Sequence, residues 1–283
     1  MPTPRQTPSP RRLRPVRSAS LSLPRLSVLF ALLLSTLLAA AGTSPAHAAG
    51  QRYVALGDSY SSGLGAGGYD SASGACKRSS QAYPALWAAA HAPSSFAFTA
   101  CAGALAGDVA TRQLGPVNAS TTLISVSVGG QDAGFSDVMT TCVLYSEAAC
   151  LNRVAQARRF VDTSLPGLLD PAYTAIHTKA PHARVVVLGY PRIYQVQGVC
   201  LLGLTDAARK AIDAVADDMD SVIAKRAADH GFAFVDVRGR FTGHELCSGA
   251  AWLHSVTLPV DESYHPTAAG QSGGYLPAFA AAA

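Results

Sequence analysis

The sequence predicts an α/β fold built on a parallel sheet of five strands. Short apolar runs recur along the chain and alternate with longer stretches that are compatible with helices. Such alternation is typical of a parallel sheet, because consecutive parallel strands are joined by crossover helices. The five predicted strands cover residues 53–56, 96–99, 123–128, 184–188 and 232–237.

Helices are predicted over residues 81–91, over 151–163 with a continuation toward 179, and over 205–230. The third is the best marked, because Thr205 can cap its N-terminus, apolar residues recur at helical spacing and Gly231 follows its end. In an open parallel sheet the ligand site lies outside the carboxyl ends of the strands. A site is therefore expected in the polar segments after the first three strands, residues 57–59, 101–104 and 129–132.

The first 48 residues differ in composition from the rest of the chain. They hold six arginines, no acid and an apolar stretch over 26–41, and they end in Ala46-His47-Ala48, a sequence typical of signal-peptide cleavage. The stretch is short for a membrane span and is interrupted by hydroxyl residues. We predict a secretory signal peptide over 1–48, one domain over 49–283, a secreted protein and no stable membrane insertion after cleavage.

The charge of the predicted mature chain argues against nucleic-acid binding. Removing the six leader arginines leaves 16 basic residues against 18 acids, a formal charge of −2, and the remaining Lys and Arg residues form no stripe. The 235 residues from 49 to 283 are enough for one α/β domain with its own core. We expect a monomer.

All six cysteines lie in the predicted mature chain, an even number that favours disulfides in an exported protein. Sequential pairing closes local loops between adjacent elements, so it is preferred among the possible pairings. A zinc site is disfavoured because no C-x-x-C spacing occurs and no His lies close in sequence to a cysteine pair. The predicted pairs are Cys76 with Cys101, Cys142 with Cys150, and Cys200 with Cys247.

Ser59 and His265 are the candidate catalytic residues. Ser59 follows the first predicted strand, where a sharp turn into a helix can present a serine hydroxyl beside backbone N–H groups. A serine becomes a good nucleophile when an imidazole takes its proton, and His265 is the candidate base. Residue type alone does not distinguish Ser59 from Ser61 and Ser62. The G-x-S-x-G elbow of the α/β-hydrolases is absent here.

The blocks Gly57-Asp58-Ser59, Gly103, Gly129-Gly130-x-Asp132 and His265-Pro266 together resemble the SGNH hydrolases, also called GDSL esterases and lipases. The likeness is closest to secreted actinomycete members and covers essentially all of the predicted mature chain, including the order and spacing of the cysteines. It implies a three-layer α/β/α, flavodoxin-like sandwich. It also implies Ser59 as nucleophile, His265 as general base, and Ser59 and Gly103 as oxyanion-hole donors.

Gln131 departs from the family pattern, which places Asn after the Gly-Gly pair. A Gln amide can also donate to the oxyanion, but its extra methylene shifts the donor and adds a rotamer. Misplacing one such donor costs about 10² to 10³ in turnover. We therefore expect Gln131 to complete the oxyanion hole with reduced activity, and a non-catalytic binding protein on the same scaffold stays an alternative.

The base needs an acceptor for its second ring nitrogen. Glu262 lies three residues before His265, where the family often has Asp, and it could serve by its carboxylate or its carbonyl; Asp261 is a weaker candidate. The remaining polar residues near the motifs are read as structural: His244, His254, Asp58 and Asp132.

The resemblance implies hydrolysis of carboxylic esters, with lipid-like or other small acyl esters as substrates and an acyl-enzyme on Ser59. Apolar segments that could receive an acyl chain are residue 135, residues 190–194 and residues 201–204. Deacetylation of a glycan is the second enzymatic reading. The mechanism is complete without a metal or an organic cofactor, so none is expected.

Overall fold

We describe residues 50–198, 200 and 203–283 of a computed structural model. The predicted signal peptide and the predicted apolar residues Leu201 and Leu202 lie outside these residues. Five parallel strands form one sheet in the order β2-β1-β3-β4-β5. Their bounds are β1 Arg52–Gly57, β2 Ser95–Phe98, β3 Leu123–Ser127, β4 Arg184–Leu188 and β5 Ala233–Val235.

The central strands are apolar because both faces of the sheet are covered. Every residue of β3 is buried, as are all residues of β1 and β4 except the first of each. An unbroken apolar run is typical of a parallel strand with helices on both sides. The predicted five-stranded parallel sheet is therefore confirmed, although β5 is shorter than the run over 232–237.

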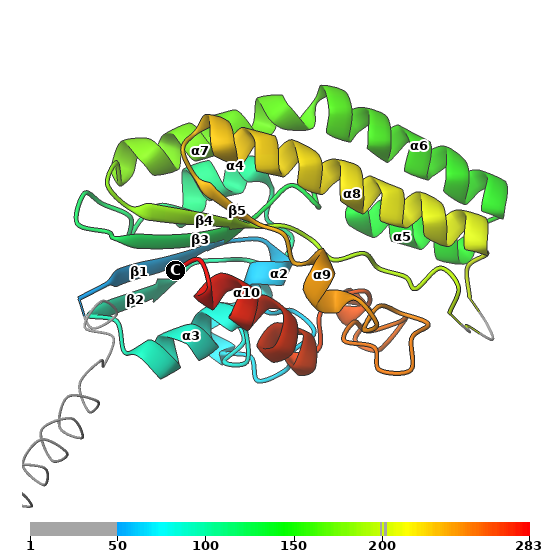
Figure 1. Cartoon of the computed structure of the whole chain (residues 1–283), viewed down its shortest axis with the longest axis horizontal. Helices are drawn as coiled ribbons and strands as arrows, with labels where there is room; N and C mark the ends of the chain where they lie inside the picture. Colours follow the sequence, from blue (N-terminus) through cyan, green and yellow to red (C-terminus); the bar gives the residue numbers. More distant parts are fainter. Residues whose placement is uncertain (1–49, 199, 201–202) are drawn as a thin grey trace, which may run out of the picture. The chain divides into compact units, whose positions relative to one another are not determined.

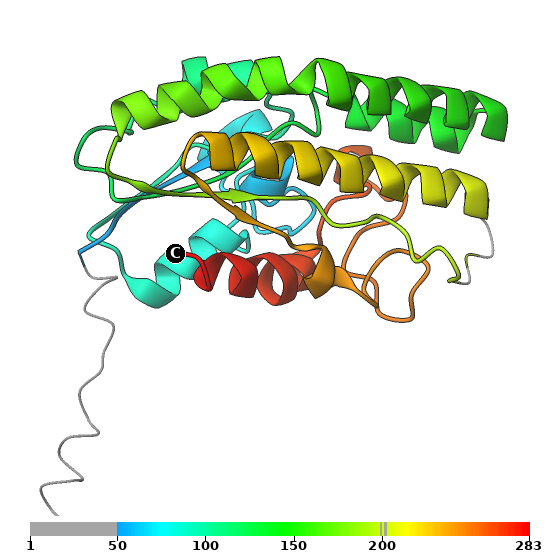
Figure 2. The same ribbon diagram turned by 45° about the horizontal axis from the view of Figure 1, so that its top comes forward.

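Helices cover the sheet in two layers (Figures 1 and 2). One face carries α3 (Tyr83–His91) and α10 (Leu276–Ala280), with α9 (Arg238–Phe241) nearby. The other face carries α4 (Ala106–Asp108), α7 (Leu165–Lys179) and α8 (Asp206–Asp229), and α6 (Glu147–Thr163) packs on α8. This is the expected three-layer α/β/α sandwich. The remaining elements are α2 (Ser59–Ser62), α5 (Phe135–Leu144), η1 (Ser71–Cys76), η2 (Val109–Gln113), η3 (Val260–Glu262) and η4 (Gly270–Tyr275).

The predicted helices are present with shifted ends. α6 begins earlier than expected because the Ser146 hydroxyl accepts a hydrogen bond from the Ala149 N–H at 3.3 Å and caps it. Its expected continuation is a separate helix, α7, which starts at Leu165 with Pro166 in its first turn. Thr205 caps α8 as predicted, accepting from the Ala208 N–H at 3.2 Å.

The three disulfides pair sequentially, as the sequence predicted. Cys76–Cys101 ties η1 to the loop after β2, Cys142–Cys150 joins α5 to α6, and Cys200–Cys247 joins the segment after β4 to the loop after α9. Closed loops of this kind stabilise a fold by about 2 to 4 kcal/mol each in the chain-entropy model. Among the described helices, none is both long and apolar enough to cross a membrane.

Candidate active site

Ser59 follows the carboxyl end of β1, an inner strand of the sheet, and lies in the first turn of the short helix α2. The strand ends at Gly57, and the Asp58 carboxylate caps the helix by accepting from the Tyr60 N–H at 3.0 Å. The cap starts the helix at residue 59 and so fixes the position of Ser59 at the sheet edge.

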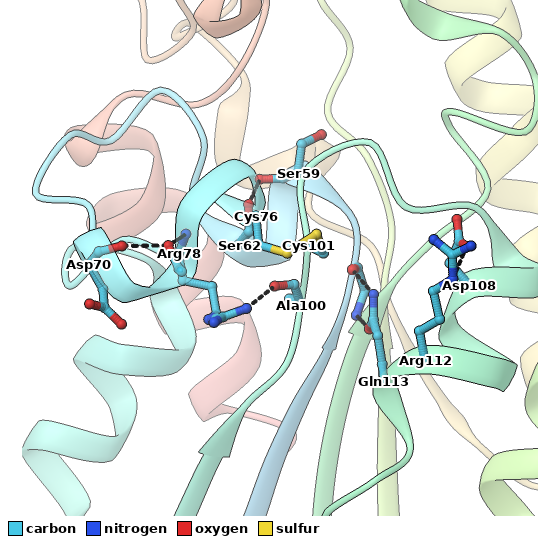
Figure 3. Close-up of a disulfide and its surroundings, with 12 residues drawn as sticks. Ser59, Ser62, Asp70, Cys76, Arg78, Ala100, Cys101, Asp108, Arg112 and Gln113 are labelled. Carbon is cyan, nitrogen blue, oxygen red and sulfur yellow. Dashed lines mark hydrogen bonds and ion pairs between the residues drawn. A yellow bond between two sulfur atoms is a disulfide. The ribbon is translucent and has the colours of Figure 1, made fainter.

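The backbone just before Ser59 is held by a buried glutamine that sequence reasoning missed. The Gln113 side chain accepts from the Gly57 N–H at 2.7 Å and donates to the Gly57 carbonyl at 2.8 Å (Figure 3). Gln113 is only 3% exposed, so both bonds are shielded from water. These two bonds hold the N–H and the carbonyl of Gly57, and so keep the turn that carries Ser59 in a single conformation.

The structure brings the predicted nucleophile and base together, although they are 206 positions apart in the sequence. The Ser59 Oγ lies 2.8 Å from the His265 Nε2. The other ring nitrogen, Nδ1, lies 3.0 Å from the Ser263 carbonyl oxygen. A carbonyl can only accept, so Nδ1 carries the proton and Nε2 is left to accept from the serine hydroxyl. This tautomer is the one that a general base requires.

The expectation that Glu262 orients His265 is contradicted by the structure. Tyr264 adopts a left-handed backbone conformation with φ of 65°, and the Ser263 carbonyl, not Glu262, meets the imidazole. The Glu262 carboxylate instead accepts from the Tyr69 hydroxyl at 2.8 Å, and its carbonyl accepts from the His265 N–H at 3.2 Å. Glu262 therefore braces the loop without touching the ring.

Glu262→Gln is expected to lower kcat/KM by less than about tenfold, because the amide oxygen can still accept from Tyr69. Loss of a carboxylate that orients the base costs about 10⁴. Steady-state kinetics on a water-soluble ester distinguish the two cases. A drop of several orders of magnitude in a folded variant would assign the orienting role to the Glu262 side chain.

Burial keeps His265 neutral. Its side chain is enclosed by Tyr60 and Phe135, whose ring centres lie 5.3 and 5.9 Å from the imidazole centre. Burial lowers the pKa of His265 to about 4, and the hydrogen bond to the Ser263 carbonyl opposes this shift. A lowered pKa leaves the imidazole unprotonated at neutral pH, which is the state that accepts a proton from Ser59.

The acid limb of the kcat/KM profile is expected below the ordinary histidine pKa of 6.5, displaced toward about 4. Activity falls only when the base takes up a proton, and a lowered pKa moves this event to more acidic solution. The profile is measured on a soluble ester beside the variant Asp58→Asn, because burial raises the pKa of Asp58 to about 6. A wild-type limb at pH 6.5 or above would contradict the prediction.

Asp58, read from the sequence as structural, links the nucleophile turn to the third motif. Besides capping α2, its carboxylate accepts from the Ser127 hydroxyl at 2.7 Å and from the Tyr190 hydroxyl. The Tyr190 oxygen in turn accepts from the Gly130 N–H at 3.1 Å. This buried chain sets the segment before Gln131 relative to Ser59.

The second motif is tied to the first and to the third. The Cys101 N–H donates to the Gly57 carbonyl at 3.0 Å, and the Cys76–Cys101 disulfide lies beside α2 (Figure 3). Asp132, also read as structural, accepts from the Ala106 N–H at 3.1 and 3.2 Å. Gly103 has a φ of 78°, and its N–H donates to no acceptor among the described residues. That N–H remains available to a ligand.

Gln131 lines the same cavity as Ser59. Its amide oxygen accepts from the Ser136 hydroxyl at 3.2 Å, which leaves the NH₂ group as the part of the side chain that can donate into the cavity. The longer side chain is thus held by a neighbour from α5.

The cavity beside Ser59 is apolar and has a volume of about 60 Å³. It runs between the carboxyl end of the sheet and helices α5, α6 and α8. Phe135, Tyr190 and Ile193, all from segments that the sequence predicted as acyl-binding surface, are among the lining residues. The apolar side chains supplied by the three helices are Val138, Met139, Ala157, Ile212, Val215, Ala216 and Met219.

The other histidines near the site have structural contacts. The His254 Nε2 donates to the Gly65 carbonyl at 2.8 Å, and the His244 ring stacks on Trp252 with centres 3.6 Å apart. Within the described ranges, no group of three or more His, Cys, Asp or Glu side chains is arranged to hold a metal ion.

A serine hydroxyl bonded to a neutral imidazole, at the carboxyl edge of a three-layer α/β fold, is typical of serine hydrolases. A model of the GDSL-like Lipase/Acylhydrolase family matches residues 55–272. The chain belongs to this family, as the sequence motifs predicted, and is a carboxylic ester hydrolase.

Characterised relatives share most of the chain. A lipase from Streptomyces rimosus is 61% identical over 251 residues, which span 87% of this chain and 94% of that protein. The crystal structure of an extracellular lipase from Streptomyces rimosus aligns with a TM-score of 0.81 at 62% identity, covering 82% of this chain and 100% of that one. A phospholipase A1 from Streptomyces albidoflavus gives a TM-score of 0.81 at 60% identity, covering 83% and 100%.

Proposed function

We propose that this chain is a secreted lipase that hydrolyses acyl esters of lipids through an acyl-enzyme on Ser59, with His265 as general base. The observation that carries the proposal is the 2.8 Å contact between Ser59 Oγ and His265 Nε2, with the opposite nitrogen bonded to the Ser263 carbonyl. The apolar cavity beside Ser59 supports an acyl chain as the group that is bound.

In the proposed reaction, Ser59 Oγ attacks the ester carbonyl carbon and its proton passes to His265 Nε2. The carbonyl oxygen becomes an oxyanion that accepts from the Ser59 and Gly103 N–H groups and the Gln131 amide. The imidazolium then protonates the leaving alcohol as the carbon–oxygen bond breaks. His265 then takes a proton from a water molecule, whose oxygen attacks the carbonyl carbon of the acyl-enzyme. The imidazolium returns that proton to Ser59 Oγ as the bond between this oxygen and the acyl group breaks, which releases the fatty acid.

Secretion is supported by the three disulfides, which are typical of oxidising compartments, and by the relative described as an extracellular lipase. The signal peptide proposed over residues 1–48 would supply the export route.

A fluorophosphonate probe tests the nucleophile directly, because it phosphonylates an activated serine. The folded wild type is expected to label at one site, identified by peptide mass spectrometry as Ser59, and Ser59→Ala is expected not to label. Ser62→Ala is the matched control, since the Ser62 hydroxyl bonds the Ser59 carbonyl and lies in the same helix without contacting His265. Labelling that persists in Ser59→Ala or disappears in Ser62→Ala would overturn the assignment.

A panel of acyl esters tests the substrate class. Because apolar side chains line the cavity, activity is expected to rise from acetyl to longer acyl groups as each buried methylene contributes about 0.8 kcal/mol. An optimum on acetyl esters, with no activity on longer chains, would favour a glycan deacetylase.

A further inference from the structure

Most of the large apolar side chains that are exposed among the described residues lie in one region beside the active site. Nine large apolar residues are exposed among those described, and six of them belong to two segments. One segment is the end of α5 with the residue that follows it, and the other is the loop between His254 and His265. We call the six residues the apolar rim: Val143, Leu144, Tyr145, Val256, Leu258 and Val260.

The two segments border one hollow. Val143 from α5, Tyr145 just after that helix and Val256 from the loop line a depression of about 690 Å³, together with Tyr264, the neighbour of His265. Helix α5 also supplies Val138 and Met139 to the cavity beside Ser59. The hollow and the part of the site proposed to receive the acyl chain are therefore bordered by successive turns of one helix.

The loop that carries Val256, Leu258 and Val260 is joined directly to the segment that contains His265. Its ends are joined by two backbone hydrogen bonds, from the His254 N–H to the His265 carbonyl at 3.0 Å and from the Tyr264 N–H to the His254 carbonyl at 2.9 Å. Within it, the Thr257 N–H donates to the Ser263 hydroxyl at 3.0 Å, while the Ser263 carbonyl accepts from His265. Leu258 and Val260, 89% and 70% exposed, thus project from the segment that holds the imidazole.

The apolar rim carries no charge that would select a charged partner. Residues 138–146 and 248–260 contain no Asp, Glu, Lys or Arg, and the first charged residues beyond them are acids, Glu147 and Asp261. An uncharged apolar surface flanked by carboxylates fits an electrically neutral lipid–water interface, and it disfavours an anionic membrane.

We propose that the apolar rim docks this enzyme on neutral lipid surfaces, with Leu258 and Val260 inserted below the headgroups and the Ser59 cavity facing the lipid. The inference rests on the proposed lipid-ester activity. It adds the surface by which a substrate that is insoluble in water reaches the site, since a docked loop holds His265 and the adjoining hollow at the interface from which the acyl chain must be drawn.

The test uses the mature chain carrying Ser59→Ala, so that vesicles are not degraded. Partitioning onto phosphatidylcholine vesicles is measured by sedimentation for this protein, for the same protein with Leu258→Ser and Val260→Ser, and for a matched control with Leu168→Ser. Leu168 is 41% exposed on α7 and does not line the hollow. The rim variant is expected to lose about tenfold or more in partition coefficient, and the control is expected to match its parent.

A second measurement separates this inference from the proposed function. With Ser59 restored, the rim variant should hydrolyse a short water-soluble ester at the wild-type rate and lose activity on emulsified long-chain esters. Equal partitioning of rim variant and parent, or no partitioning of the parent, would overturn the docking surface and point to a protein partner for the rim. Absence of soluble-ester hydrolysis in wild type would overturn the proposed function alone.

Phosphatidylglycerol, an anionic lipid, distinguishes docking on a neutral lipid surface from docking on a negatively charged one. Adding it to the vesicles is expected to leave partitioning unchanged or weaken it, with little response to salt. Partitioning that rises strongly with anionic lipid and is abolished by salt would mean that basic residues drive docking, and would overturn the assignment to the apolar rim.

Discussion

Ser59→Ala is expected to lower kcat for ester hydrolysis by about 10⁴ to 10⁶. The substitution removes the only hydroxyl that the described structure brings to the His265 Nε2, and with it the covalent route. His265→Ala should cost a similar factor, because a serine without its base is a weak nucleophile. Steady-state and single-turnover kinetics on a soluble ester measure both effects.

The double variant provides a sharper criterion than either single one. If Ser59 and His265 act as a unit, the combined loss is about that of one substitution, because the second removes nothing that still functions. Losses that multiply would show that the two side chains act independently. Ser62→Ala should keep most of the wild-type rate, and a collapse in that variant would move the nucleophile to Ser62.

Gly57→Ala is expected to destabilise the fold by more than about 4 kcal/mol. Gly57 has a φ of 122°, a conformation that L side chains rarely adopt, and a Cβ there would meet the Ser127 carbonyl and lie 2.8 Å from the Ser127 nitrogen. Both atoms belong to β3, which cannot move away without breaking its pairing with β1. Urea unfolding, or soluble yield if the variant does not fold, is the measurement.

Gly167→Ala is the matched control. This glycine lies inside α7, and a Cβ added to it meets nothing within 4 Å. Replacing a helical glycine by alanine stabilises by about 0.5 to 1 kcal/mol. If Gly57→Ala were as stable as Gly167→Ala, β1 and β3 would have to lie further apart than the structure places them.

The sequence predicted the sheet because its strands are continuous apolar runs, and their burial on both faces produces that pattern. It also predicted the Ser59–His265 pair, because a serine nucleophile needs an imidazole base and because the motifs that contain the two residues resemble the nucleophile and base blocks of the family. It did not predict α10 or α5, which are short or lack strong capping signals. The start of α6 is set by the Ser146 cap, and the start of α7 lies next to Pro166. Both local signals were missed because the apolar pattern runs through this whole stretch.

Sequence reasoning assigned the wrong residue to orient His265, and it overlooked Gln113, for the same reason. Both roles depend on backbone groups: the carbonyl of Ser263 in one case, and the N–H and carbonyl of Gly57 in the other. Any residue type has a carbonyl, so no side-chain pattern indicates which one meets the ring. A carboxylate near His265 in sequence was the natural candidate, but Tyr69 engages it.

Because a main-chain carbonyl accepts from the imidazole, this hydrogen bond responds little to amino-acid substitution and to pH. No amino-acid replacement at position 263 deletes a carbonyl, so mutation can disturb that hydrogen bond only by bending the loop. Random mutagenesis screened for inactive clones should therefore recover many at positions 59 and 265 but few at a third, acidic position. The same carbonyl stays an acceptor at every pH, so this support for the base does not titrate away in acid.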